Sequence, residues 1–273
     1  MPKISVYLTQ SLIADDLVLK DKNVIIIDVL RATTTITYAL VNGAKEVIPA
    51  ENPTKAAKIR GASSKLLCGE RNGKKIEGFD FGNSPFEYLN DKIKDKILIF
   101  STTNGTVSII KSKHGKNVVL ASFINLTRIV EFIKSLNADV VLLCSGKLNN
   151  FCMEDFVCAG TIIRELQSNP EGTEYTISDT ETAAVRLAEM FAYRGNEINS
   201  EAVFEMFKTT EHGKYLSSLG FTEDLKFASQ VDSYPMLPIY SKEVVKLKEQ
   251  IEMETTQKLS MKKINLTTKD NPK

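Results

Sequence analysis

Residue types that many enzyme sites depend on are scarce in this sequence. Its 273 residues contain no tryptophan, two histidines and four cysteines. Two histidines are too few for a His-rich zinc site or for a phosphatase that uses a histidine pair. His114 and His212 each precede Gly-Lys, which predicts surface turns, with His212 the better candidate for a role. The cysteines form no C-x-x-C pair, which favours free thiols in a reducing compartment.

An excess of one charge sign and long apolar runs are also absent. Lys and Arg total 35 against 34 Asp and Glu, a net charge of +1. This balance argues against broad binding to nucleic acid or to an anionic membrane. No apolar run is long enough to span a bilayer and no secretory signal is visible. We therefore expect a soluble cytoplasmic protein that binds neither nucleic acid nor membrane.

Familiar phosphate-binding motifs are missing as well. The sequence has no G-x-x-x-x-G-K-[ST] and no G-x-G-x-x-G. Cys158 and Arg164 have the C-x5-R spacing of cysteine phosphatases, but the residues between them are apolar and helical in pattern. Asp28 lacks the second aspartate of haloacid-dehalogenase phosphatases, since Leu30 stands two residues on. These observations argue against nucleotide folds built on those two motifs and against the cysteine and haloacid-dehalogenase phosphatases.

What the sequence does contain is an alternation of strand and helix patterns. The predicted strands are Asn23–Asp28, Lys45–Ala50, Lys96–Phe100, Asn117–Ala121 and Asp139–Cys144, and the predicted helices are Thr33–Val41, Thr54–Arg60 and Met153–Gln167. This order predicts an α/β fold with a largely parallel or mixed sheet. A strand–Thr-rich turn–helix–strand pattern occurs twice, over 24–50 and 97–121, which allows two similar subdomains.

The pattern divides the chain into three regions. Residues 1–168 form the α/β region that carries most of the site. Residues 169–241 form a smaller helical or mixed region that closes the same fold, with helices at Asp179–Tyr193 and Ser200–Lys208. Residues 242–273 are a charged helix, Lys242–Lys263, followed by a frayed tail, Thr267–Lys273.

The segment Asp28–Thr35 directly follows a buried strand. Asp28 can ligate Mg²⁺ or attack a phosphorus, and Arg31 can clamp an oxyanion. Thr33 and Thr34 start a helix whose free N–H groups attract anions. The alternative is an N-cap cluster with an incidental arginine. Three consecutive β-branched threonines are poor helix formers, which favours a functional role.

A second polar turn, Ser101–Thr106, has the same placement after a strand. Its candidate phosphate-binding residues are Thr102, Thr103, Asn104, Gly105 and Thr106. A capped turn without function has the same composition. Because ligands of such sheets bind beyond the carboxyl ends of strands, we expect this turn, Asp28 and Ser145-Gly146 to lie together.

Two further segments add polar groups. Gly69-Glu70-Arg71 and Gly78–Pro85, with Asn83 and Ser84, belong to one long polar loop that is either functional or packed by its phenylalanines. Glu154 and Asp155 open the helix after the strand that ends at Cys144. They are dipole partners of that helix or part of a Mg²⁺ site with Asp28.

Taken in order, five segments resemble the 2-phosphosulfolactate phosphatase family. They are DVLRATTT at 28–35, GE at 69–70, GFDFGNSP at 78–85, TTNGT at 102–106 and EDFVCAG at 154–160, within a resemblance over roughly residues 4 to 240. The resemblance implies a three-layer α/β/α fold, a homodimer and a Mg²⁺-dependent phosphatase. Its reaction would convert (R)-2-phospho-3-sulfolactate to 3-sulfolactate and phosphate, a step toward coenzyme M. The chain departs from the family pattern at Asn149–Met153.

The reaction implied by the resemblance suits the residues present. Asp28 and Arg31 would be catalytic, and Asp28, Glu70, Glu154 and Asp155 supply the hard oxygen ligands that Mg²⁺ prefers. Thr33, Thr34, Asn83, Ser84 and the 102–106 turn would bind the small anionic phosphorylated substrate. Two alternatives remain: a Mg²⁺-dependent phosphatase acting on another small phosphorylated hydroxy acid, and a phosphoester-binding protein without turnover.

Overall fold

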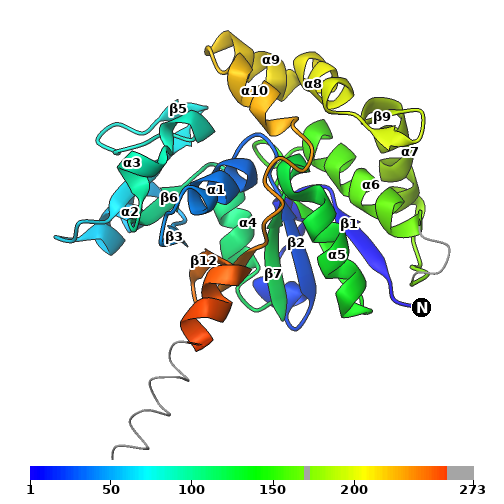
Figure 1. Cartoon of the computed structure of the whole chain (residues 1–273), viewed down its shortest axis with the longest axis horizontal. Helices are drawn as coiled ribbons and strands as arrows, with labels where there is room; N and C mark the ends of the chain where they lie inside the picture. The colour runs from blue at the N-terminus through cyan, green and yellow to red at the C-terminus, as the bar shows by residue number, and fades with distance from the viewer. Residues whose placement is uncertain (169–172, 257–273) are drawn as a thin grey trace, which may run out of the picture.

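The computed structural model describes residues 1–168 and 173–256. The strands are β1 (Ile4–Tyr7), β2 (Asn23–Ile27), β3 (Glu46–Pro49), β4 (Leu66–Arg71), β5 (Lys74–Lys75), β6 (Ile97–Ser101), β7 (Asn117–Ala121), β8 (Val140–Cys144), β9 (Tyr193–Arg194), β10 (Glu197–Ile198), β11 (Pro238–Ser241) and β12 (Val244–Leu247). The α-helices are α1 (Ala32–Val41), α2 (Pro53–Arg60), α3 (Asn90–Ile93), α4 (Gly105–Lys111), α5 (Leu126–Leu136), α6 (Met153–Gln167), α7 (Asp179–Phe191), α8 (Ser200–Thr209), α9 (Glu211–Ser218) and α10 (Thr222–Ala228). A ten-stranded sheet has the order β1-β8-β2-β7-β11-β12-β3-β6-β4-β5 (Figure 1).

The sheet is the middle of three layers, as predicted. Alternate residues of β2 face opposite sides: Ile25 and Ile27 belong to the core under α5, α6 and α7, whereas Val24 and Ile26 pack with α1 and α4. At the other end of the sheet, α2 packs its Ala56 into a smaller core. The apolar run of β2 is therefore buried on both faces, and the α/β/α arrangement is confirmed.

The sheet consists of two parallel sets of strands that run in opposite directions. β1, β8, β2 and β7 are parallel to one another, and so are β3, β6 and β4. The hairpin β11–β12 joins the sets through three consecutive antiparallel pairings, from β7 to β11, β11 to β12 and β12 to β3. Since each antiparallel pairing reverses direction, three of them leave the two sets antiparallel.

The two repeated segments of the sequence are interleaved in this sheet. In the first, β2 belongs to one set and β3 to the other, with α1 between them. In the second, β6 and β7 are likewise divided between the sets, with α4 between them. β2 pairs with β7 and β3 pairs with β6, so the repeats share one fold instead of forming separate subdomains.

The C-terminal part differs from the prediction. The predicted helix from Lys242 is wrong over Val244–Leu247, which is strand β12, and residues 248–256 are helical. Alternation of Val245 and Leu247 with polar residues, and their burial against the sheet, outweigh the helical charge pattern. The remainder of the predicted helix and the tail Thr267–Lys273 lie outside the described residues. The three-region division remains a prediction.

Three elements that position the site were not predicted. Strand β4 includes Gly69 and Glu70, which were placed in a loop, and helices α9 and α10 follow α8 to form a group above the ends of the strands (Figure 1). Short polar helices of this kind carry a weak periodic signal. No helix within 1–168 or 173–256 is both long and apolar enough to cross a bilayer.

The contact between α6 and α7 depends on a glycine. A Cβ at Gly160 would lie 2.0 Å from the carbonyl oxygen of Ala184, which is backbone and cannot rotate away. The two helices therefore approach more closely than an alanine would allow.

We expect Gly160→Ala to lower the free energy of unfolding by about 1–3 kcal/mol, the usual range for overpacking. In an uncrowded helix the same change would stabilise by roughly 1 kcal/mol, so the sign separates crowding from helix propensity. Urea denaturation measures the free energy of unfolding of Gly160→Ala and of a control, Gln167→Ala, on the exposed last turn of α6. An unchanged or higher stability for Gly160→Ala would refute the close contact.

Candidate active site

A cavity of about 290 Å³ lies where the polar turns after β2 and β6 meet. Its floor comes from these turns and from the β4–β5 turn, and its wall comes from the loop after β8 and from α9. The charged and polar residues that line it include Asp28, Arg31, Glu70, Asn83, Thr102, Thr103, Asn104, Lys147 and His212. Seven of these nine were predicted from the sequence, and they do lie together.

The two polar turns meet because the first turns of α1 and α4 are in contact. A Cβ at Gly105 would lie 2.5 Å from both Oδ2 of Asp28 and Cβ of Ala32. Only a glycine allows this approach, so Gly105 has a packing role here and does not line the cavity. The carboxyl ends of β2 and β6 thus converge although their strand sets run in opposite directions. We expected the two turns to meet because both follow strands at one edge of a parallel sheet, and this reason is wrong.

Among the carboxylates of the site, Asp28 accepts the fewest hydrogen bonds from the described residues. It is 7% exposed, and in the described part of the chain its side chain accepts one hydrogen bond, from the N–H of Ala32 at 3.1 Å. The pKa of Asp28 is raised to about 7, chiefly by burial and also by the nearby carboxylates of Glu70 and Glu154, while the hydrogen bond from Ala32 and the Arg31 guanidinium oppose the rise. A pKa near neutrality is typical of a group that reacts or binds a cation.

Glu70 also faces the cavity, but it is firmly held. Its two carboxylate oxygens accept the N–H groups of Thr103 and Gly73, each at 2.8 Å. Glu70 therefore connects the β4–β5 turn to the turn after β6. Asp28 and Glu70 are the two carboxylates that the structure brings to the cavity lining.

Asp155 lies behind the cavity and not in it. Its oxygens accept the N–H groups of Val29 at 2.9 Å and Gly146 at 3.2 Å, which fixes the chain after β2 against the chain after β8. Burial raises the pKa of Asp155 well above its usual range, and the neighbouring Asp28 raises it further. This residue supports the Asp28 loop, and its position does not favour the predicted role as a magnesium ligand.

Arg31 is held in a fixed orientation at the edge of the cavity. It donates to Oδ2 of Asp224 at 2.5 Å and to the carbonyl of Gly73 at 2.9 Å, and its guanidinium lies 4.2 Å from the ring centre of Phe221. Burial raises the pKa of Asp224, although Arg31 opposes this shift. Ser84 donates to the other oxygen of Asp224, so it positions this pair and does not line the cavity.

The predicted threonines divide into two groups. The hydroxyls of Thr33 and Thr34 donate to backbone carbonyls, and Thr106 exchanges hydrogen bonds with Thr102, so these groups shape the turns. Thr103 faces the cavity, and its Oγ1 is buried without a partner in the described residues. Oδ1 of Asn83 is in the same situation. Unpaired buried polar atoms in a cavity indicate that a polar ligand belongs there.

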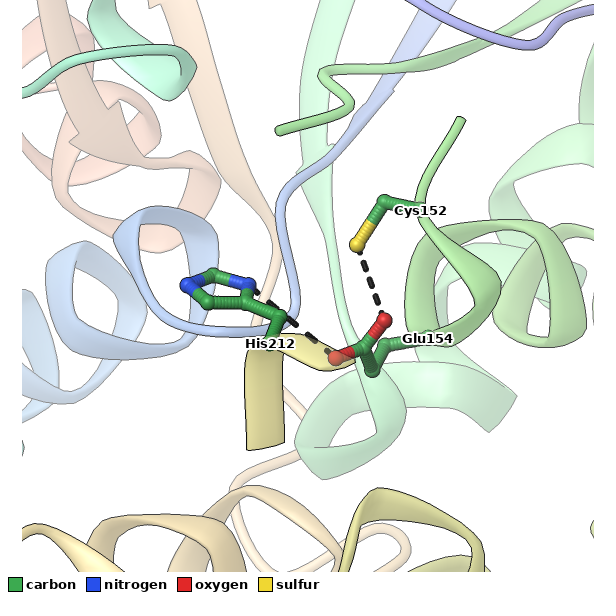
Figure 2. A group of neighbouring side chains, drawn as sticks. All are labelled: Cys152, Glu154 and His212. Atoms are coloured by element: carbon green, nitrogen blue, oxygen red, sulfur yellow. Dashed lines mark hydrogen bonds and ion pairs between the residues drawn. The ribbon is translucent and has the colours of Figure 1, made fainter. Parts of the chain in front are cut away.

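Glu154 belongs to a separate cluster beside the cavity. Figure 2 shows its carboxylate between the thiol of Cys152 and the imidazole of His212. Cys152 donates to Oε2 at 2.9 Å, and Thr210 donates to Oε1 at 2.7 Å. Among the described residues, this is the one group of three or more potential metal ligands within 4.8 Å of one another. The four predicted magnesium ligands do not gather in that way.

The chain was compared with known proteins. The sequence pattern of the 2-phosphosulpholactate phosphatase family matches residues 7–243. The chain belongs to this family. A relative from Caldanaerobacter subterraneus is 40% identical over 81% of this chain and 88% of its own. Relatives from Thermotoga petrophila and Clostridium acetobutylicum are 40% and 37% identical, over 84% and 81% of this chain and 93% and 91% of theirs. Each relative is named "probable 2-phosphosulfolactate phosphatase".

Membership in this phosphatase family, a family of hydrolases, agrees with the sequence resemblance. The family motifs did not reveal Lys147, His212 or Asp224, which come from the loop after β8 and from α9 and α10. His212 was predicted to lie on the surface and is largely buried instead, with a side chain that is 16% exposed, because α9 packs over the cavity. Burial lowers the pKa of His212, the neighbouring Glu154 carboxylate opposes this shift, and Lys147 and Arg31 add to it. Its position in the sequence alone gave no sign of this.

The cysteine-phosphatase spacing is a coincidence. Cys158 lies in the middle of α6 and is fully buried, and burial raises the pKa of its thiol well above the usual range. A buried neutral thiol on a helix is not a nucleophile.

The raised pKa of Asp28 predicts a pH-dependent stability. Below pH 4 the carboxyl is protonated in both states and costs nothing. Between about pH 4 and about pH 7 the unfolded state ionises while the folded state keeps the proton, so this group lowers stability progressively over that window and the loss levels off above about pH 7. The comparison is between the free energies of unfolding of Asp28→Asn and wild type, both without divalent cations. Their difference should favour the variant by about 3 kcal/mol more at roughly pH 8 than at roughly pH 5. Urea unfolding in EDTA measures it, with Asp91→Asn as the exposed control. A constant difference would contradict the raised pKa.

Proposed function

We propose that this protein is a Mg²⁺-dependent phosphatase that hydrolyses (R)-2-phospho-3-sulfolactate to 3-sulfolactate and phosphate. One observation carries the proposal: the carboxylates of Asp28 and Glu70 share a cavity with the cations of Arg31 and Lys147. The names of the family and of its relatives supply the substrate. The role in coenzyme M formation, the homodimer and the cytoplasmic location remain predictions.

The cavity suits a small molecule with several anionic groups. Its volume of about 290 Å³ is at the lower end of the range for ligand sites. The substrate carries a phosphate, a sulfonate and a carboxylate, which require several donors. Arg31, Lys147 and the amide of Asn83 can supply them. This charge pattern favours a short phosphorylated acid over a nucleotide.

The residues present fit a magnesium ion. Mg²⁺ is usually bound by one or two carboxylates together with substrate phosphate and waters, and Asp28 and Glu70 supply two such groups. The pKa of Asp28, raised to about 7, reflects a buried carboxylate whose charge the Arg31 guanidinium offsets only in part. When bound, Mg²⁺ would neutralise charge on the phosphoryl oxygens.

The remaining chemistry belongs to the chain itself. Asp28 either attacks the phosphorus, forming an aspartyl phosphate that a water then hydrolyses, or orients a water that attacks directly. On both routes the released phosphate takes one oxygen from water, and the bond from phosphorus to the substrate's ester oxygen breaks. That oxygen takes up a proton and leaves as the alcohol of sulfolactate. Arg31, fixed by Asp224 and Gly73, keeps its remaining N–H groups directed at an anionic group of the substrate.

We expect phosphate release to depend on the cation and on Asp28. Activity should vanish in EDTA, return with Mg²⁺ and return poorly with Ca²⁺, which prefers longer bonds and more ligands. Asp28→Asn should lower kcat by about 10³-fold or more, while Asp91→Asn should match wild type.

The assay is phosphate release from a panel of phosphorylated sulfo and hydroxy acids. Preference for another phosphorylated hydroxy acid would contradict the proposed substrate but not the proposed mechanism. Binding without phosphate release from any compound would instead make this a phosphoester-binding protein. Full activity in chelated, metal-free protein would refute the magnesium requirement.

A further inference from the structure

The cluster beside the main cavity combines three chemically different ligand groups. The thiol of Cys152, the carboxylate of Glu154 and Nδ1 of His212 have atoms within 4.8 Å of one another (Figure 2). Sγ of Cys152 lies 2.9 Å from Oε2 of Glu154, and Nδ1 of His212 lies 4.0 Å from Oε1. Cys152 directly precedes α6 and Glu154 lies in its first turn, while His212 lies in the first turn of α9.

One atom of this cluster has no partner. Nδ1 of His212 is buried and makes no hydrogen bond within the described residues. Buried polar atoms in native proteins are almost always hydrogen-bonded, so an unpaired one calls for a ligand. Its direction toward Glu154 and Cys152 in Figure 2 places the missing ligand among the three side chains.

We propose that Cys152, Glu154 and His212 bind a transition-metal ion of the Zn²⁺ class, separate from the proposed magnesium ion. Thiolate and imidazole ligands select zinc and its neighbours, whereas Mg²⁺ prefers an all-oxygen set such as Asp28 and Glu70. The proposal rests on these three side chains and not on the phosphatase reaction.

The spacing needs little adjustment to hold zinc. With bonds of about 2.0–2.3 Å, the ligand atoms of a tetrahedral site lie roughly 3.3–3.8 Å apart. The present separations, from 2.9 Å to at most 4.8 Å, bracket that range. Thr210 already orients the carboxylate through a hydrogen bond of 2.7 Å to Oε1. Such outer contacts are typical of metal sites.

Three protein ligands leave a fourth position open. A second cavity of about 340 Å³ is lined by the same three residues and by Lys147. His212 and Lys147 also line the main cavity, so the ion would lie at the boundary between the two. An open position is typical of catalytic or ligand-responsive zinc sites, while closed structural sites use four protein ligands.

Binding requires no redox partner. The Cys152 thiol donates a hydrogen bond to Oε2 of Glu154. When the metal–sulfur bond forms, the S–H bond breaks and one proton leaves to solvent.

The test is metal binding by the full-length protein, stripped by a chelator and kept in excess Mg²⁺. Zn²⁺ is titrated against a chromophoric chelator, and Co²⁺ is used for its absorption. We expect one equivalent of Zn²⁺, and a thiolate-to-cobalt charge-transfer band with Co²⁺. Cys152→Ser and His212→Gln should each weaken Zn²⁺ binding by about 100-fold or more and remove the zinc-induced rise in Tm.

Matched controls use residues of the same types elsewhere. Cys158→Ser, at a buried cysteine of the same helix, and His114→Gln, at an exposed histidine, should bind Zn²⁺ as wild type does. Zinc binding that survives Cys152→Ser, or cobalt binding to wild type without the thiolate band, would overturn the proposal. Failure to bind any Zn²⁺ would do the same and would leave the phosphatase assay unaffected.

Discussion

The burial of negative charge around one cavity is the constraint on which this structure depends. Asp28, Glu70, Glu154, Asp155 and Asp224 are all at most 8% exposed. A buried carboxylate is costly unless it is paired or accepts hydrogen bonds, and the fold supplies a different solution at each position. Glu70 and Asp155 accept backbone N–H groups, Asp224 pairs with Arg31, and Glu154 bonds to a thiol and a hydroxyl. Asp28 has the poorest compensation, which leaves it as the group that a cation would stabilise most.

The topology explains how so many carboxylates meet. Two parallel strand sets run in opposite directions, and α1 and α4 cross between them so that their first turns touch at Gly105. The polar turns of both repeated segments therefore reach one cavity from opposite sides. Helix α9 of the α8–α10 group then covers this cavity and contributes His212, while α10 carries Asp224 beside it. The buried pair of Arg31 with Asp224 ties that cover to the turn after β2.

Local patterns predicted the centre of the fold well, because their signals are local. The strand Asn117–Ala121 and the helix Met153–Gln167 match to the residue, and seven polar residues of the cavity were identified from two turns that follow strands and from the long polar loop. Features that depend on contacts between distant segments could not be predicted from the sequence. The place of β12 in the sheet, the reversal between strand sets and the burial of His212 depend on pairing between distant segments. The side-chain roles of Thr33 and Asp155 depend on which backbone groups lie nearby.

Asp28 is a buried carboxylate whose charge is only partly offset by Arg31, and we infer that a divalent cation relieves it. Carbon-13 labelling of aspartate and a pH titration of the Asp28 carboxyl resonance, assigned with Asp28→Asn, test this directly. In metal-free protein the midpoint should lie at about 7, and saturating Mg²⁺ should move it to lower pH because the cation favours the charged form. A midpoint near the ordinary value of about 4 without metal, or one that Mg²⁺ does not change, would contradict the account.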